Sequence, residues 1–361
     1  MRRVVLTTGG TGGHIFPALA VAEELLERHP GCKVLFVGGE RGKERDFAQR
    51  AGLEFLGLPA QGVVGGGLRS LGAVLWLTRS LWRAWNLMRT FKPDVVLGFG
   101  GYAGFVPVVA AWMRGVPRAI HEQNCLAGFS NRILGTLSQR VLLSLPDVNH
   151  VFNPRRTVLT GNPVRREIRD LGGRDVQSRP RGRRLLVFGG SQGARAINDK
   201  IIEALPVLAE REFEIWHQTG GADEERVRQA YEALDWGPRR HRVEAFIHDM
   251  EEAYAWADLV LCRAGATTVA ELAVAGLPSV LVPYPHATHG HQDWNASYLE
   301  DAGAAAVLKQ ALMEEMDLAQ ALEAYVENPE RLERMALAAR KVGRPDAASA
   351  VVDELEKLSL N

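Results

Sequence analysis

Short apolar runs alternate with longer amphipathic segments along almost the whole chain. The runs have the length of buried β-strands, and the segments between them carry apolar residues at helical spacing. Six strands are predicted in the first half, at Arg3–Thr7, Lys33–Val37, Asp94–Phe99, Arg118–His121, Arg140–Ser144 and Val158–Gly161. Six more are predicted in the second half, at Arg184–Phe188, Glu214–Gln218, Arg242–Ala245, Leu259–Cys262, Ser279–Pro283 and Ala305–Leu308. Because strands that alternate with helices form parallel sheets covered by helices, each half predicts a doubly wound α/β domain.

The two halves open in the same way, with a strand, a glycine-rich turn and the start of a helix. A chain of 361 residues also exceeds what one core usually fills. We therefore expect an N-terminal domain over 1–162 and a C-terminal domain over 163–340, with a last helix over 341–361 that packs back on the first domain. Two Rossmann-like domains joined in this way leave a deep cleft between the carboxyl ends of their sheets, where ligands bind.

Composition indicates the class of protein, and the two halves of the chain differ in net charge. Apolar residues make up 46% and charged residues 24%, which excludes a disordered, collagen-like or disulfide-scaffold chain. The net charge is +9 over 1–160 and −9 over 161–361. The basic half predicts contact with an anionic surface, whereas the overall balance of 43 basic and 43 acidic residues indicates no nucleic-acid partner.

Cysteine spacing and hydropathy bear on the compartment. The three cysteines lie far apart without a CxxC pair, which is typical of a reducing compartment and does not favour structural zinc. No signal-peptide pattern precedes the first strand. The longest uncharged stretch, Val95 to Met113, is interrupted by several glycines and Pro107, so it predicts a strand, a loop and a buried helix. We expect a cytoplasmic protein that does not cross a membrane.

The first glycine loop, Gly9–Gly13, leads into a helix whose first turn holds His14. Glycines let the backbone approach a ligand, and the helix N-terminus offers free N–H groups, which suits a diphosphate. The same N-terminus disfavours a charged histidine, so we expect a neutral imidazole that accepts a proton. A tight turn without a ligand and a structural histidine are the alternatives.

Two further polar motifs follow strands of the first half. The glycine cluster Gly98–Gly104 comes after the strand that begins at Asp94, and His121–Asn124 ends the next strand. Four hydrogen-bonding side chains at a strand end indicate a ligand or a neighbouring loop that satisfies them.

The second half repeats the phosphate-binding pattern. Gly189–Gly193 follows one strand, and Thr267 and Thr268 follow another at the start of a helix. Glu271 is expected one turn inside that helix, where it accepts hydrogen bonds from a ribose diol; a capping box is the alternative. The histidines of 289–295 favour a helix cap or a sugar contact over a metal. The P-loop and serine-hydrolase motifs are missing from the sequence.

The segment from Leu68 to Arg89 predicts a basic amphipathic helix, because no acidic residue occurs from Phe55 to Pro93. Tryptophan and arginine on one helix favour a lipid headgroup boundary. The residues expected to contact the membrane are Leu75, Arg79, Trp82, Arg83, Trp85 and Trp112. A core-facing helix with a solvated basic face explains the pattern equally well.

These motifs, in this order over essentially the whole chain, resemble the MurG family of bacterial transferases. The segments that carry the resemblance are Gly9–His14, Gly98–Gly104, His121–Asn124, Gly161–Arg165, Gly189–Arg195, Arg263–Glu271 and His291–Asn295. The resemblance implies a two-domain GT-B fold and an inverting transfer of N-acetylglucosamine from UDP-GlcNAc to the muramyl 4-hydroxyl of a lipid-linked muramyl-pentapeptide, the lipid I acceptor. It further implies that the transfer needs neither a metal nor another cofactor. A peripheral place on the cytoplasmic face of the inner membrane, contact with its anionic lipids and a cell-wall synthesis complex follow from the same resemblance.

The resemblance also implies roles for individual residues. The donor UDP-GlcNAc is expected to contact Thr11, Gly12, Asn124, Arg165, Ser191, Ile247, Ala266, Thr267, Thr268, Glu271 and Gln292. The acceptor is expected to contact Gly13, His14, Gly100, Gly101, Tyr102, His121 and Glu122. His14 is the candidate general base, with Glu122 as the weaker alternative. A role for His14 in binding the acceptor pyrophosphate stays open.

Other functions share part of this pattern. A related glycolipid synthase has the same fold but is expected to lack the His121–Asn124 motif. A UDP-GlcNAc 2-epimerase needs additional acid and base residues, and a noncatalytic UDP-sugar sensor needs no acceptor loops. A dehydrogenase is disfavoured because no acidic residue at the end of a predicted strand follows the first glycine loop by about 20 positions.

Overall fold

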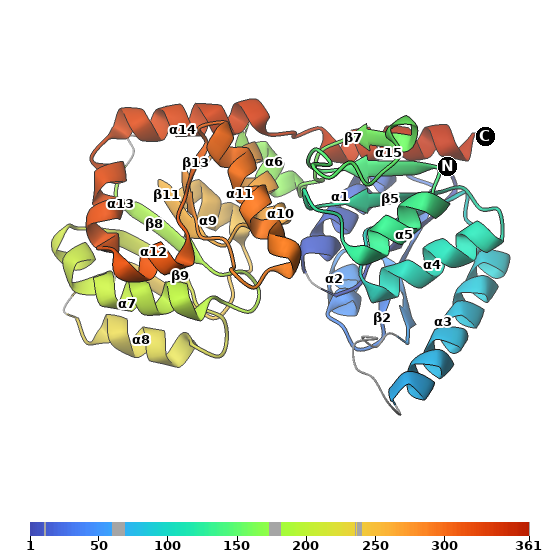
Figure 1. Ribbon diagram of the computed structural model, residues 1–361, viewed down its shortest axis with the longest axis horizontal. Helices are drawn as coiled ribbons and strands as arrows, with labels where there is room; N and C mark the ends of the chain where they lie inside the picture. The colour runs from blue at the N-terminus through green and yellow to red at the C-terminus, as the bar shows by residue number, and fades with distance from the viewer. Residues whose placement is uncertain (11, 60–68, 173–181, 235, 237–239, 361) are drawn as a thin grey trace. The chain divides into compact units, whose positions relative to one another are not determined.

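The computed structural model describes residues 1–10, 12–59, 69–172, 182–234, 236 and 240–360 (Figure 1). For residues 69–75 it describes the backbone alone. The chain divides into two compact units. Unit 1 consists of Met1–Arg165 and Asp346–Asn361, and unit 2 of Arg166–Pro345. The division thus lies three residues beyond the expected boundary at 162, and the chain returns to unit 1 at Asp346 rather than at 341.

Unit 1 is built on a seven-stranded parallel sheet in the order β3-β2-β1-β4-β5-β6-β7. Its strands are β1 (Arg3–Thr7), β2 (Lys33–Gly39), β3 (Glu54–Leu58), β4 (Val95–Gly98), β5 (Arg118–Glu122), β6 (Arg140–Leu143) and β7 (Thr157–Leu159). Its helices are α1 (Gly12–Arg28), α2 (Glu44–Arg50), α3 (Arg69–Phe91), α4 (Tyr102–Met113), α5 (Phe129–Leu137) and α15 (Ala347–Ser359), with a 3-10 turn at Pro154–Arg156. The strand order reverses between β1 and β4, which makes their carboxyl ends the switch point of the sheet.

Both faces of this sheet are buried, because successive strand residues point to opposite sides. Val4 and Leu6 of β1 pack with residues of α1 and α15 in one core. Val5, between them, packs with residues of α3, α4 and α5 in a second core. This explains why the strands are apolar at every position rather than at alternate ones.

Unit 2 repeats the architecture with a six-stranded parallel sheet in the order β10-β9-β8-β11-β12-β13. Its strands are β8 (Arg184–Phe188), β9 (Glu214–Gln218), β10 (His241–Glu244), β11 (Leu259–Cys262), β12 (Ser279–Leu281) and β13 (Ala305–Val307). Its helices are α6 (Arg166–Gly172), α7 (Arg195–Glu210), α8 (Glu224–Glu232), α9 (Met250–Trp256), α10 (Ala266–Ala275), α11 (His291–Asp301), α12 (Gln310–Glu315), α13 (Leu318–Val326) and α14 (Pro329–Val342), with a 3-10 turn at Thr288–Gly290. The switch point here lies between β8 and β11.

The expected fold class is confirmed, since both units are doubly wound α/β domains. All twelve predicted strands are present, with ends that differ by at most two residues. The uncharged stretch from Val95 to Met113 forms β4, a loop and α4, as the glycines and Pro107 predicted. One further strand, β3 at the edge of the first sheet, is not predicted by the sequence pattern.

The last helix, α15, belongs to unit 1 and lies against α1, where Figure 1 shows it in red among the blue and green elements. Val351, Val352 and Leu355 are fully buried in the core that α1 shares. Polar contacts lie beside this core, with an ion pair of 2.5 Å between Arg28 and Asp353 and a hydrogen bond of 2.8 Å between His29 and Glu356. The end of the chain is therefore part of the core of the first unit.

We predict that Leu355→Ala lowers the free energy of unfolding by about 3 kcal/mol, because it leaves a cavity beneath α1. Leu360→Ala is the matched control, since that side chain is 87% exposed. Denaturant unfolding followed by circular dichroism measures both variants. Equal stability of the two variants would mean that α15 is not part of the cooperative unit.

Candidate functional site

Two glycine loops meet at the switch point of unit 1. Gly10 and Gly101 have φ angles of +101° and +77°, which side chains rarely adopt. A Cβ on Gly101 would lie 2.1 Å from the carbonyl oxygen of Gly9, and one on Gly9 would lie 2.9 Å from the amide nitrogen of Ala103. The loops after β1 and β4 therefore pack backbone against backbone, and their glycines are required by this contact. Thr11, expected at the donor, lies outside the described residues.

The first loop is held by a hydrogen bond to a buried carboxylate, Glu44, that is not among the residues expected at the site. Glu44, the first residue of α2, is 2% exposed, and its Oε1 accepts the N–H of Gly10 at 3.1 Å. The same oxygen lies 3.5 Å from the amide nitrogen of Gly39 at the end of β2. Glu44 thus fixes the loop that precedes α1, and no signal in the sequence distinguishes it from Glu40, the acidic residue that directly follows the glycines of β2.

His14 lies half-buried in the first turn of α1 and begins a chain of hydrogen bonds. Its Nδ1 is 2.8 Å from Oε1 of Gln123, and Nε2 of Gln123 is 3.1 Å from Nδ1 of His121. Nε2 of His121 lies 3.0 Å from the carbonyl oxygen of Gly161. His121 is fully buried, and desolvation lowers its pKa to about 4, so it is neutral at physiological pH. The structure therefore connects His14 to His121 through Gln123, for which the sequence predicts no individual role.

Glu122 is buried and surrounded by donors. Its Oε1 accepts the backbone N–H of Asn124 at 3.0 Å and the side-chain amide of the same residue at 3.3 Å. Its Oε2 accepts from the N–H of Gly128 at 3.1 Å and from Nδ2 of Asn131 at 2.9 Å. This carboxylate holds the loop between β5 and α5, which favours a structural role for Glu122 over that of a general base.

The remaining expected acceptor residues lie around these loops. Gly12 and Gly13 open α1 and are half-buried. Gly100 has a φ angle of +93° and lies against the side-chain amide of Asn131. Tyr102 begins α4 and is 47% exposed, so its ring is accessible to a ligand.

The first glycine loop of unit 2 has the same construction as that of unit 1. Gly190 and Gly193 have φ angles of +88° and +74°. A Cβ on Gly189 would lie 2.3 Å from the amide nitrogen of Ala194, and one on Gly193 would lie 2.0 Å from the carbonyl oxygen of Thr219. Ser191 is exposed on this loop between β8 and α7. The loop thus presents backbone and a hydroxyl at the second switch point.

The neighbouring strand β11 leads into α10, whose first residues are Ala266, Thr267 and Thr268. The threonines are half-buried, and the cap residue Gly265 has no side chain to occupy the helix N-terminus. Glu271 is 5% exposed and accepts the hydroxyl of Tyr254 at 3.0 Å. Since it lies six residues beyond the cap, the capping box considered from the sequence is wrong.

Two further expected donor residues lie on loops of unit 2. Ile247 is buried between β10 and α9, and Oε1 of Gln292 accepts the N–H of Tyr284 at 2.9 Å. His291 lies at the start of α11 with Nδ1 at 2.8 Å from the carbonyl oxygen of Thr288. Within the described parts of the chain, no group of three histidine, cysteine, aspartate or glutamate side chains is arranged to hold a metal ion.

Arg165 and Asn124, both expected at the donor, fall in unit 1. The guanidinium of Arg165 lies over the ring of Phe16, near the start of α1, 4.6 Å from its centroid. Asn124 is half-buried beside Glu122. The expected donor residues therefore come from both units, with the larger share at the switch point of unit 2.

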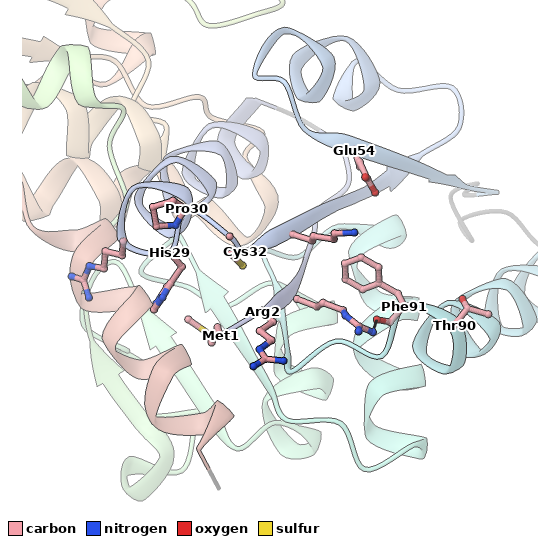
Figure 2. Close-up of a pocket in the computed structure, with 12 residues that line it drawn as sticks. Met1, Arg2, His29, Pro30, Cys32, Glu54, Thr90 and Phe91 are labelled. Atoms are coloured by element: carbon pink, nitrogen blue, oxygen red, sulfur yellow. Dashed lines mark hydrogen bonds between the residues drawn. The ribbon is translucent and has the colours of Figure 1, made fainter.

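A hollow of about 780 Å³ lies at the opposite, amino-terminal edge of the first sheet (Figure 2). Figure 2 shows basic side chains around it, and Arg3 and Lys33 there begin β1 and β2. Arg28 and His29 are paired with α15, and Nη1 of Arg3 donates to the carbonyl of Phe91 at 2.8 Å. The partners of Arg28, His29 and Arg3 come from unit 1 itself, which favours a structural role for this edge.

The comparison with known proteins follows the same division of the chain. The N-terminal domain of glycosyltransferase family 28 matches residues 4–143, and the C-terminal domain of that family matches residues 184–351. A relative from Nitratidesulfovibrio vulgaris, named UDP-N-acetylglucosamine--N-acetylmuramyl-(pentapeptide) pyrophosphoryl-undecaprenol N-acetylglucosamine transferase, is 57% identical over 359 residues, 99% of this chain and 98% of the relative.

Solved structures agree with this assignment. The crystal structure of Acinetobacter baumannii MurG has a TM-score of 0.77 at 35% identity and covers 99% of this chain and 100% of its own. A UDP-GlcNAc 2-epimerase from Neisseria meningitidis has a TM-score of 0.67 at 15% identity over 98% of this chain and 100% of its own, a likeness of fold alone. The expected GT-B class is confirmed by these neighbours. With both domains matched and a relative more than half identical along its length, the chain belongs to glycosyltransferase family 28 and, within it, to the MurG family.

Proposed function

We propose that this chain transfers N-acetylglucosamine from UDP-GlcNAc to the 4-hydroxyl of the N-acetylmuramyl sugar in a pyrophosphoryl-undecaprenol-linked pentapeptide. The observation that carries this proposal is the 57% identity over 99% of the chain to a relative named for that transfer. The site adds a second argument, because both switch points carry glycine loops suited to phosphate groups. A donor and an acceptor that both contain a diphosphate would use one such loop each.

The donor is assigned to unit 2. Ser191, Thr267 and Thr268 would bind its diphosphate beside the N-terminus of α10, and Glu271 would accept from the ribose hydroxyls. The backbone at Ile247 would contact the uracil, and Gln292 the N-acetylglucosamine. Arg165 would add a positive charge at the leaving diphosphate.

The acceptor is assigned to unit 1, where its pyrophosphate would lie at the loops that contain Gly13 and Gly100. The muramyl 4-hydroxyl attacks the anomeric carbon as its proton passes to His14. The new C–O bond forms on the face opposite the leaving group, and the bond from the anomeric carbon to the phosphate oxygen breaks. UDP leaves with the electron pair, and backbone N–H groups of unit 2 would stabilise its charge without a metal ion.

The membrane location is also a proposal. In the part of the chain that the structure describes, no helix is both long and apolar enough to span a bilayer. Unit 1 nevertheless exposes large apolar side chains on the neighbouring helices α3 and α4, among them Trp82 and Trp112. We propose that this face meets the anionic lipids of the cytoplasmic leaflet, where the acceptor's prenyl chain is anchored.

The test is UDP release from UDP-GlcNAc in EDTA, with and without a short-chain lipid-linked muramyl-pentapeptide. Release that depends on the acceptor is expected, and it would establish the transfer together with its independence from a metal. Release that needs added magnesium would contradict the second part alone. UDP-GlcNAc binding without any release, even with magnesium, would favour a noncatalytic sensor, and release without the acceptor would favour an epimerase-like or hydrolytic reaction.

A further inference from the structure

The chain of hydrogen bonds from Gly161 through His121 and Gln123 to His14 determines which ring nitrogen of each histidine carries a hydrogen. A backbone carbonyl only accepts, so Nε2 of His121, 3.0 Å from the oxygen of Gly161, must carry a hydrogen. His121 is fully buried and uncharged, because burial lowers its pKa to about 4. A neutral imidazole has one N–H, so Nδ1 of His121 carries a lone pair.

The amide of Gln123 then has only one orientation. Its Nε2 lies 3.1 Å from Nδ1 of His121 and also 3.1 Å from the carbonyl oxygen of His121. Both partners are acceptors, so the NH₂ group must face them. With the amide flipped, its oxygen would face two acceptors and make no hydrogen bond to them, which is costly because Gln123 is only 1% exposed. Oε1 of Gln123 therefore faces Nδ1 of His14 at 2.8 Å, and that nitrogen must donate.

We propose that Gln123, oriented by His121, fixes neutral His14 as the Nδ1–H tautomer, so that Nε2 presents the lone pair that takes the proton of the attacking hydroxyl. Gln123 and His121 are then positioning residues that act through His14. This inference rests on the proposed transfer for its catalytic meaning, while the tautomer itself is a property of the protein alone. It also gives His121 a role other than the acceptor contact expected from the sequence.

The chemistry of the proposed contact suits a general base. When Nε2 takes a proton, Nδ1–H keeps its bond to the amide oxygen, so no rearrangement accompanies the step. An amide oxygen carries no full charge, unlike the carboxylate that orients histidine in hydrolase triads. The partner thus fixes the tautomer without adding the charge attraction by which a carboxylate favours the protonated imidazole.

The tautomer can be measured without turnover. Two-bond proton–nitrogen NMR spectra of full-length protein with isotope-labelled histidine distinguish Nδ1–H from Nε2–H, and His14→Ala identifies the signal of His14. At alkaline pH we expect the Nδ1–H form in the wild type and a mixture or the Nε2–H form in Gln123→Ala. An Nε2–H form in the wild type, or an unchanged tautomer in Gln123→Ala, would overturn the inference.

Turnover gives the second readout. Gln123→Ala is expected to lower kcat about tenfold, which is less than the loss expected when the general base itself is removed. The KM for UDP-GlcNAc should stay unchanged within about twofold. Gln123→Glu keeps an oxygen toward His14, and a proton shared between its second oxygen and Nδ1 of His121 replaces the amide N–H at that contact. At alkaline pH this variant should therefore retain the Nδ1–H tautomer and recover much of kcat. Ser144→Ala, a buried hydroxyl just after β6, is the matched control and should leave both readouts unchanged.

The two proposals fail in different ways. If Gln123→Ala shifts the tautomer but His14→Ala retains turnover, His14 is not the base and the tautomer assignment stands. If His14→Ala abolishes turnover but Gln123→Ala changes neither the tautomer nor kcat, the role of Gln123 is refuted and the transfer proposal stands. Should Gln123→Ala fail to fold, Gln123→Glu decides, because an Nε2–H form in that variant contradicts the inference.

Discussion

His14→Ala is expected to lower the turnover of acceptor-dependent UDP release about 10³-fold while UDP-GlcNAc binding stays unchanged. The reason is the placement of His14 in the first turn of α1 in unit 1, with its Nδ1 held by Gln123 at 2.8 Å. The expected donor contacts at Ser191, Thr267 and Glu271 belong to unit 2. Steady-state kinetics with a short-chain acceptor and calorimetric titration of UDP-GlcNAc measure the two effects separately.

His29→Ala is the matched control for this variant. His29 follows the last residue of the same helix and pairs with Glu356 of α15 at 2.8 Å, so its loss should leave turnover unchanged. Unchanged turnover in His14→Ala would remove His14 from the mechanism. A rise in the acceptor KM with kcat preserved would instead assign His14 to the acceptor pyrophosphate, because a base contributes only in the transition state.

Most of the fold could be predicted because the signal is local. Buried parallel strands such as β1 and β8 are continuous apolar runs next to glycine turns, and both follow directly from the sequence. The sequence pattern does not predict β3, because a strand at the edge of a sheet buries less apolar surface than a central strand. Its residues begin with an exposed Glu54, include Gly57 and are mostly only half-buried, so its pattern does not differ from that of a loop.

The candidate site could be predicted only in part. Backbone contacts require glycine at several positions of both loops, so the loops can be recognised in the sequence as clusters of glycine. The roles of Gln123 and Glu122 depend instead on which way adjacent side chains point at the end of β5. His121–Asn124 reads as one polar motif, yet Gln123 faces His14 while Glu122 faces Asn131 and the loop before α5. His14 lies 109 residues from Gln123 in the sequence, and Asn131 lies nine residues from Glu122 across an irregular loop, so neither contact carries a spacing signal.

The proposed membrane face of unit 1 is defined by four exposed side chains of α3 and α4. They are Trp82, Trp85, Trp112 and Met113, exposed by 68%, 36%, 48% and 47%. The opposite side of α3 is buried, since Ala84 and Met88 pack in the second core of unit 1. From the sequence, a core-facing helix is the alternative to a membrane-facing one. The structure combines the two: one side of α3 packs on the core, and Trp82 and Trp85 are exposed to solvent. The side chain of Leu75, also expected here, lies outside those the structure describes.

Arginines accompany this face. The guanidinium of Arg114 lies 4.7 Å from the ring centroid of Trp85, Arg79 is exposed, and Arg83 forms an ion pair with Glu40. Cations beside exposed indole rings suit the boundary between anionic headgroups and acyl chains. A surface with these properties should bind vesicles through two contributions, one apolar and one that decreases with salt.

The double variant Trp82→Ser/Trp85→Ser is expected to weaken binding to vesicles of anionic phospholipid about a hundredfold, since burying two large side chains contributes roughly 3 kcal/mol. Turnover with a short-chain soluble acceptor should be unchanged, because neither tryptophan belongs to the glycine loops. Leu312→Ser/Leu337→Ser is the matched control, two apolar side chains of unit 2 that are 58% and 54% exposed. Vesicle flotation at low and high salt measures binding. Equal vesicle binding by wild type and the tryptophan variant would refute the membrane face, whereas a loss of soluble-acceptor turnover would show that α3 supports the acceptor loops instead.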